Sequence, residues 1–190
     1  MKLSRTYRIL KNLGFNLSEE QYGEITLWRA TKRVIKGTLN ACILKYCMYS
    51  VILAPLNYRK IRPILWRWMG VKVGKNVFIG YDVWMDYNNA HLIELQQGAH
   101  ITNRCILLCH KRNLDNYYVG DDSTKLPYKI QKIVVGKNVM VGMGTTIMPG
   151  VTIGEGSIIA ANSLVTKNIP AWTIAAGNPA KVIKEIQRRK

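Results

Sequence analysis

The chain has 190 residues, of which 48% are apolar, and 28 Lys and Arg against 11 Asp and Glu give it a formal net charge of +17. This length fits one domain or a domain with an appendage, and the apolar content excludes a disordered polycation. Most of the charge lies near the start, because residues 1–75 hold 15 basic and 3 acidic residues. A charge of this kind suggests three classes of binding partner: nucleic acid, an anionic membrane and other polyanions.

The residues themselves exclude several classes of protein. The four cysteines form no CxxC pair and are too few for a disulfide framework or a zinc ribbon. The N-terminus lacks the apolar core of a signal peptide, and Pro55 interrupts the longest uncharged stretch, which is too short to span a bilayer. No nucleic-acid-binding motif accompanies the charge, so we expect no nucleic acid partner. The expected location is cytoplasmic.

Residues 1–70 are expected to form a basic, largely helical segment. The stretch SEEQ resembles a capping box, with Ser18 as the N-cap and Gln21 three residues later. A helix is then predicted from Ile25 to about Ala54. Three of the five tryptophans lie in this segment: Trp28, Trp66 and Trp68. A combination of tryptophan, aliphatic and basic residues is typical of a helix that lies on an anionic membrane. The membrane surface expected for this segment is the inner face. Packing against the rest of the protein or another subunit, with solvated charges, is the alternative.

An internal repeat begins at Val135. Six consecutive hexads follow without a gap: VGKNVM, VGMGTT, IMPGVT, IGEGSI, IAANSL and VTKNIP. Every first position is a β-branched aliphatic residue, and the second positions are mostly small. A period of six fits neither a helix nor an open sheet. It fits a coil of three short strands joined by tight turns, in which aliphatic residues fill the interior and stacked coils bury a continuous core.

A less regular block has the same phase: VGKNVF (73–78), IGYDVW (79–84), LQQGAH (95–100) and ITNRCI (101–106). The polar and aromatic residues of the irregular stretch that follows are expected to form an external loop. The predicted fold is therefore mainly β. It consists of a parallel β-helix over residues 71–179, with an external loop at about 111–132, and a short C-terminal helix over 180–190 after the Asn178-Pro179 turn.

The hexads, together with the segment AAGNPAKVIKEI, resemble the hexapeptide-repeat acyltransferases, which are left-handed parallel β-helices. The maltose/galactoside O-acetyltransferases and the acetyltransferases of bacterial surface-polysaccharide pathways are the members that this chain resembles most. The resemblance covers roughly residues 60–186. It implies a left-handed coil, a homotrimer, acetyl-CoA as acyl donor in a groove between adjacent coils, and a histidine base on the coil before the external loop. No metal is expected.

The histidine of the family matches His110 in ILLCHKR. An imidazole is suited to removing the proton of an acceptor hydroxyl near neutral pH. Asp86 in VWMDYNN is the best match to the family's upstream acidic or amide residue, and Asp82 and Asn88 lie nearby as candidates for acceptor binding. Tyr117 in the loop is a candidate for stacking on a sugar. The alternatives are a solvated or packing histidine, and a plain turn in DYNN.

The resemblance also assigns residues to the CoA groove: Gly142, Ala161, Thr166, Lys181 and Lys184. Small residues at two of these positions would let the pantetheine arm lie against the backbone, and the two lysines would lie near the CoA phosphates. For the lysines, a solvated helix face is the alternative. His91 and His100 are expected at the surface. The spacings between the three histidines do not fit the roughly 18-residue repeat of stacked coils, which argues against a carbonic-anhydrase-like metal site.

The leading prediction is an acetyl-CoA-dependent O-acetyltransferase that acetylates a carbohydrate hydroxyl in bacterial surface polysaccharide or glycolipid biosynthesis. The stretch AANSLVTKNIPAWTI also resembles the streptogramin and chloramphenicol acetylating enzymes. An antibiotic or another small molecule is therefore an alternative acceptor. A non-enzymatic β-helical scaffold that binds a membrane or a partner is the third interpretation, and it predicts no affinity for acetyl-CoA.

Overall fold

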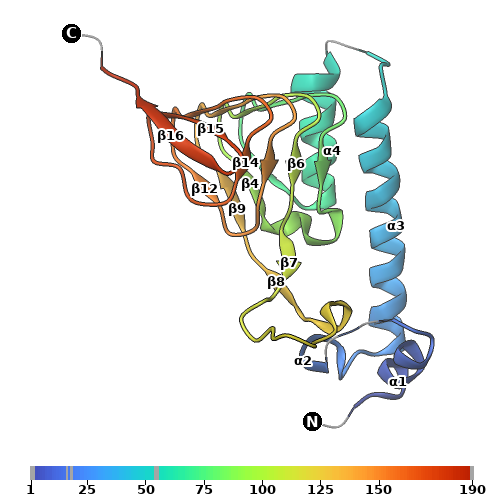
Figure 1. Ribbon diagram of the computed structural model, residues 1–190. Helices are drawn as coiled ribbons and strands as arrows, with labels where there is room; N and C mark the ends of the chain where they lie inside the picture. The colour runs from blue at the N-terminus through green and yellow to red at the C-terminus, as the bar shows by residue number, and fades with distance from the viewer. Residues whose placement is uncertain (1–2, 16, 18, 54–55, 189–190) are drawn as a thin grey trace. The chain divides into compact units, whose positions relative to one another are not determined.

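The computed structural model describes residues 3–15, 17, 19–53 and 56–188. The chain forms two compact units (Figure 1). The first contains residues 1–39 and 112–129, and the second contains residues 40–111 and 130–190, which include the hexads. The unit boundary falls inside the long helix α3 (Leu27–Tyr49), so the basic N-terminal segment contributes to both units.

The first unit begins with a capped helix. Helix α1 (Arg5–Asn12) starts after Ser4, whose hydroxyl oxygen accepts a hydrogen bond from the backbone N–H of Tyr7. The ring of Tyr7 is buried, and its hydroxyl donates to the carbonyl of Leu17 over 3.1 Å. Helix α2 (Glu19–Tyr22) follows. The predicted capping box stays a prediction, because Ser18 and the side chain of Gln21 lie outside the described residues.

The helix predicted from Ile25 to about Ala54 is confirmed over Leu27–Tyr49. It is wrong at residues 25–26 and 50–53, which are not helical, and Ala54 lies outside the described residues. Its last turns bury Leu44, Cys47 and Met48 in the core of the second unit. A π-helical turn, η1 (Asn57–Ile61), then leads into α4 (Arg62–Met69). None of the helices in the described ranges combines the length and the hydrophobicity that crossing a bilayer requires.

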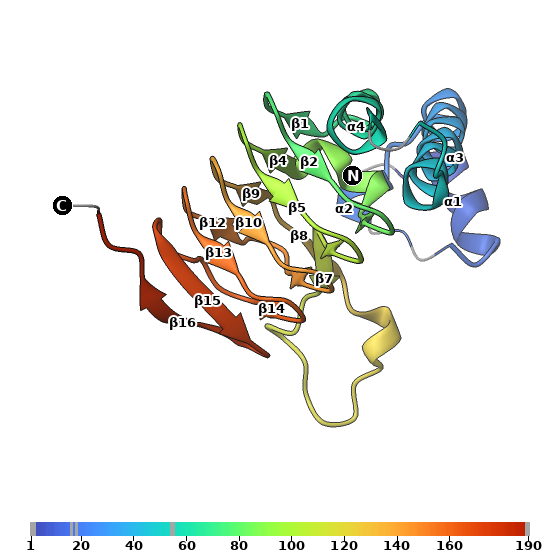
Figure 2. The same ribbon diagram turned by 90° about the horizontal axis from the view of Figure 1, so that it is seen from above.

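The second unit is a parallel β-helix with three flat faces, and Figure 2 shows its coils stacked from β1 and β2 beside α4 to β15 and β16 at the other end. The first face contains β1 (Lys72–Val73), β4 (Ile93–Leu95), β9 (Ile133–Val135) and β12 (Thr152–Ile153). The second face contains β2 (Phe78–Ile79), β5 (His100–Ile101), β10 (Met140–Val141), β13 (Ile158–Ile159), β15 (Thr173–Gly177) and β16 (Ala180–Glu185). The third face contains β3 (Trp84–Met85), β6 (Ile106–Leu107), β11 (Thr146–Ile147) and β14 (Leu164–Val165).

The register confirms three hexads per coil. Met140 pairs with Ile158 and Thr146 pairs with Leu164, so stacked residues differ by 18 in number. The side chains at the first hexad positions, such as Val141 and Ile153, are fully buried, as the sequence predicts. Two coils are longer than 18 residues. One includes the 3₁₀ helix η2 (Tyr87–Leu92), and the other includes the loop that leaves through β7 (His110–Arg112), contains η3 (Ser123–Lys125) and returns through β8 (Tyr128–Ile130).

The predicted C-terminal helix over residues 180–190 is wrong. Strand β16 pairs antiparallel with β15, and Ile186 N–H donates to the carbonyl of Trp172 over 2.7 Å. Because β15 belongs to the last coil, its outer edge would otherwise present unpaired backbone groups, which a returning strand satisfies. An isolated helix of this length would be marginal. Residues 189 and 190 lie outside the described residues.

Small residues at the second hexad positions let the coils stack closely, as the sequence predicts. At Gly142, an added Cβ would lie 2.4 Å from the backbone nitrogen of Ala161 on the next coil. Backbone atoms at that distance cannot move aside as a flexible side chain can. The stacking of the two coils therefore requires the glycine, whatever else binds there.

We expect Gly142→Ala to destabilise the protein by about 3 kcal/mol, because the new methyl group overpacks two backbones. For a chain of this size, that corresponds to a midpoint of thermal unfolding lower by roughly 6–12 °C. Thermal unfolding followed by circular dichroism checks this, with Met143→Ala at the exposed neighbouring position as the control. A midpoint equal to that of the wild type would contradict the close-stacking argument.

The cysteines are free thiols: Cys47, Cys105 and Cys109 are buried, and Cys42 is exposed. Burial raises the pKa of the Cys47 thiol to about 11. Burial, followed by the nearby Asp86 carboxylate, raises that of Cys109 to about 12. Because only the thiolate reacts, we expect a disulfide reagent at pH 8 to modify Cys42 alone in the native protein and all four thiols after unfolding. Rapid modification of two or more native thiols would contradict this burial.

Candidate functional site

Three corners join the faces of the β-helix, and the candidate residues are distributed among them. The first corner, between the first and second faces, is formed by residues 74–77, 96–99, 136–139 and 154–157. The second corner, between the second and third faces, is formed by residues 80–83, 102–105, 142–145 and 160–163. The third corner, between the third and first faces, is formed by residues 86–92, 148–151 and 166–169. Residues 108–132 also belong to this corner, and they include the external loop.

At the third corner the structure brings Asp86 and His110 together. Trp84 pairs with Ile106, so the residues that follow these two strands leave the third face on adjacent coils at the same corner. The Nδ1 atom of His110 forms a short hydrogen bond with Oδ2 of Asp86. The side chain of Asp86 is only 4% exposed, whereas that of His110 is 36% exposed. The carboxylate is therefore covered, and the imidazole reaches solvent.

A third residue, Asn89, holds the carboxylate. Its Nδ2 donates to Oδ2 of Asp86 over 2.9 Å, and its backbone N–H donates to the Asp86 carbonyl over 3.0 Å. On the other side, the backbone N–H of Asp86 donates to the Leu107 carbonyl of the next coil. Asp86 is the N-cap of η2, so the tight turn itself brings Asn89 back onto its carboxylate.

The sequence pattern indicated Asn88 and not Asn89. Asn88 is exposed, and its role in acceptor binding stays a prediction. The three-residue spacing of Asp86 and Asn89 in a tight turn could have identified the second asparagine, because an Asx side chain commonly bonds within such a turn. DYNN is thus a turn and also the support of the Asp86–His110 pair.

The hydrogen bond to Asp86 determines which imidazole nitrogen is basic. An ionised carboxylate only accepts hydrogen bonds, so Nδ1 of His110 carries the hydrogen that it donates to Asp86. In a neutral imidazole the lone pair is then on Nε2. This arrangement orients the ring and gives it a proton-accepting nitrogen on the side away from the carboxylate.

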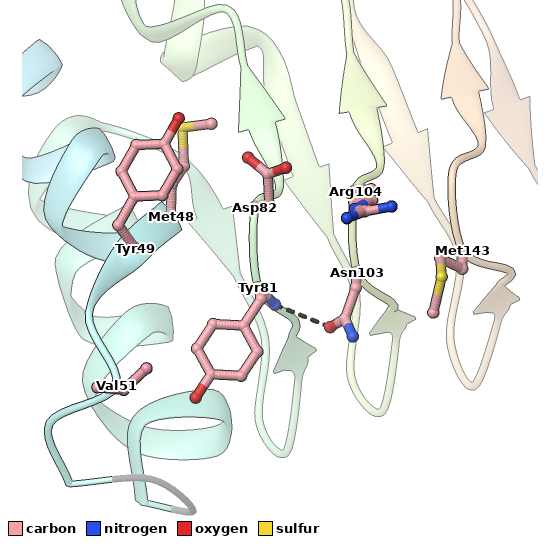
Figure 3. Close-up of a pocket in the computed structure, with 8 residues that line it drawn as sticks. All are labelled: Met48, Tyr49, Val51, Tyr81, Asp82, Asn103, Arg104 and Met143. Carbon is pink, nitrogen blue, oxygen red and sulfur yellow. Dashed lines mark hydrogen bonds between the residues drawn. The ribbon is translucent and has the colours of Figure 1, made fainter.

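Asp82 lies at the second corner, not with Asp86. Strand β3 separates the two carboxylates, and the backbone of Asp82 has a positive φ of 51°, which is turn geometry. Its side chain lines a depression of about 660 Å³ beside the end of α3 (Figure 3). The depression is lined by Met48, Tyr49, Val51, Tyr81, Asp82, Asn103, Arg104 and Met143. Asn103 Oδ1 accepts a hydrogen bond from Tyr81 N–H, so two of the lining residues tie adjacent coils together.

The candidate CoA residues lie on three different parts of the second unit. Gly142 and Ala161 stack at the second corner, next to the depression through Met143. Thr166 is exposed at the third corner. Lys181 and Lys184 are exposed on β16, an edge strand rather than the expected helix, opposite Ala176 and Ile174. Their roles stay predictions.

The remaining candidates do not join these groups. Tyr117 lies in the loop, in the first unit, and its role in acceptor binding stays a prediction. His91 is exposed as expected, but His100 is half-buried with its ring 4.0 Å from that of Phe78, and this burial lowers its pKa. Throughout the described ranges, no three His, Cys, Asp or Glu side chains group as a metal site would require.

Comparison with known proteins agrees with this architecture. Residues 132–167 match the family model described as bacterial transferase hexapeptide (six repeats). A maltose O-acetyltransferase from Clostridium difficile 630 has a similar structure, with 23% identity, a TM-score of 0.57 and coverage of 82% of this chain and 89% of that one. No curated protein sequence matches the chain.

A galactoside acetyltransferase solved in complex with coenzyme A is also similar. It shares 22% identity and a TM-score of 0.60, and the match covers 87% of this chain and 86% of that one. These findings confirm the resemblance to the hexapeptide-repeat proteins and the left-handed parallel β-helix fold.

Proposed function

We propose that the protein is an acetyl-CoA-dependent O-acetyltransferase that acetylates a carbohydrate hydroxyl in bacterial surface polysaccharide or glycolipid biosynthesis. The observation that carries the proposal is the Asp86–His110 pair, held by Asn89 at the corner where the external loop leaves the β-helix. The fold shared with a maltose and a galactoside acetyltransferase supports the same class of reaction.

In the proposed reaction, Nε2 of His110 accepts the proton of the acceptor hydroxyl as its oxygen attacks the thioester carbonyl carbon. The C–S bond then breaks, an ester forms on the acceptor, and the imidazolium returns its proton to the departing thiolate. Asp86 stabilises the imidazolium that forms between these steps and keeps Nδ1 protonated. The transfer needs no covalent enzyme intermediate and no metal.

A homotrimer would complete this site. Within one chain, the third face separates His110 at the third corner from Gly142 and Ala161 at the second. A threefold arrangement with the third corner of one protomer against the second corner of the next would bring the imidazole to that groove. Two lysines on the edge strand, Lys181 and Lys184, are proposed to contact the CoA phosphates. The proposed location is cytoplasmic, with residues 1–70 at the inner face of the membrane.

Titration calorimetry with CoA tests the donor site. We expect binding, and an affinity at least tenfold weaker for the double variant Lys181→Gln/Lys184→Gln, because it removes two cations from the phosphate region. Lys75→Gln/Lys137→Gln, which removes two exposed lysines at the first corner, is the matched control. Light scattering should report a trimer. Absence of binding at millimolar CoA would instead favour a non-enzymatic scaffold.

The acceptor class is identified separately, by measuring acetyl transfer to a panel of sugars, chloramphenicol and streptogramins.

A further inference from the structure

The end of α3 and the described residues that follow it expose a group of large apolar side chains. The apolar tip, as we call it, consists of Tyr46, Tyr49, Val51, Ile52, Leu53 and Leu56. These side chains are between 40% and 69% exposed, although they all lie between residues 46 and 56, of which 54 and 55 are outside the described residues. Scattered apolar residues are normal on a protein surface, but a cluster of this kind marks an interaction site.

The backbone beneath the apolar tip is hydrogen-bonded from below. Asn57 Nδ2 donates to the carbonyls of Ser50 and Ile52, each over 3.2 Å. Arg62 Nη2 donates to the Ser50 carbonyl over 3.2 Å as well. Both of these side chains are fully buried, so the polar atoms point inward while the apolar side chains point outward. A segment that enters hydrocarbon must satisfy its backbone polar groups internally, and here these carbonyls are satisfied in that way.

The tip is also anchored to the β-helix. The guanidinium of Arg62 lies 4.9 Å from the centre of the Tyr58 ring and 4.4 Å from that of Tyr81. Its Nη1 donates to the carbonyl of Ile79 on strand β2 over 3.2 Å. These contacts tie the residue beneath the tip, Arg62, to the β-helix.

The charges around the tip favour one kind of partner. Residues 40–70 include five basic residues and no Asp or Glu. Three of the basic residues, Lys45, Arg59 and Lys60, adjoin the tip in the sequence, and their side chains are exposed. A second copy of the same surface would bring like charges together, whereas an anionic lipid surface would neutralise them.

We propose that the apolar tip inserts into the interfacial region of an anionic lipid bilayer, with Lys45, Arg59 and Lys60 in contact with the lipid headgroups. The inference refines the membrane location that the proposed function includes, but it does not depend on acetyl transfer. The depression at the second corner shares Tyr49 and Val51 with the tip.

Co-sedimentation with phosphatidylcholine vesicles, with and without 30% phosphatidylglycerol, tests the proposal on the full chain. We expect binding at least tenfold stronger to the anionic vesicles, and a loss of at least tenfold in the variant Ile52→Glu/Leu56→Glu. Leu114→Glu/Val119→Glu, which places the same two charges at exposed apolar loop positions, should bind as the wild type does. Equal binding by the double variant, or no preference for anionic vesicles, would overturn the proposal.

Two further measurements distinguish membrane insertion from misfolding and from a subunit contact. In an Ile52→Trp variant, brominated lipids should quench the added fluorescence over the wild-type background; unchanged emission would count against insertion even if the double variant failed to fold. If Ile52→Glu/Leu56→Glu instead dissociates the oligomer in light scattering while the wild type ignores vesicles, the tip is a subunit contact and the proposal is wrong. Acetyl transfer to a water-soluble acceptor should be unchanged in the double variant, so a failure of the reaction is distinguishable from a failure of docking.

Discussion

Replacing His110 with Ala is expected to lower kcat for acetyl transfer by about 10³-fold, because the positioned general base is lost. CoA affinity should stay within about twofold, since in the proposed mechanism the imidazole acts on the acceptor proton and not on the nucleotide. Steady-state kinetics and calorimetry on the same preparation measure the two effects separately.

His91→Ala is the matched control, because His91 is exposed and lies outside the Asp86–His110 pair. It should keep the wild-type kcat. A folded His110→Ala protein that retains more than about a tenth of the wild-type kcat would falsify the assignment of the base, whatever its CoA affinity.

Removing the carboxylate partner is the change with the second largest expected effect. Asp86→Ala should lower kcat by about 10²-fold, with the KM for acetyl-CoA nearly unchanged, because the imidazole loses its orientation and the charge that stabilises its protonated form. Asp86→Asn keeps an oxygen that can accept from Nδ1 and should have an intermediate kcat. Asn89→Ala should have the smallest effect, because it removes one of the hydrogen bonds to the carboxylate.

The positioning role is separated from a structural one by kinetics. A purely structural role would lower the amount of folded enzyme and the thermal midpoint, and would leave kcat per folded site unchanged. Glu155→Ala, at an exposed acidic residue of the first corner, should keep the wild-type kcat. If Asp86→Ala raises the KM for the acceptor and leaves kcat unchanged, Asp86 contacts the acceptor and does not position the base.

The repeat predicted the coil accurately because the hexad pattern is local. A β-branched residue at every first position and small residues at the second determine which side chains face inward and where the backbone turns. Val141, Ile147 and Ile153 are buried as that pattern requires. The last residues were mispredicted because Ala180–Glu185 has no repeat, and its conformation depends on the open edge of β15.

Contacts between residues on different coils could be predicted less well from the sequence. Asp86 and His110 are 24 residues apart, and they meet because η2 lengthens one coil before β4 and the loop leaves the next coil at the same corner. Asp82 is only four residues from Asp86 in the chain, yet it lies at the second corner and lines the depression there. Closeness in sequence therefore does not place Asp82 beside Asp86 within one chain, and its role in acceptor binding stays a prediction.

By itself, the sequence determined the period of the coil and its interior side chains, because both follow from residue type at a fixed spacing. The choice of His110 as the base came from the family resemblance and stays a prediction. Only the tertiary structure decided that Asn89 holds Asp86 against His110, that the candidate CoA residues lie at other parts of the coil, and that the chain ends in a strand. These depend on how stacked coils align at their corners, and hydrogen bonds between distant residues set that alignment.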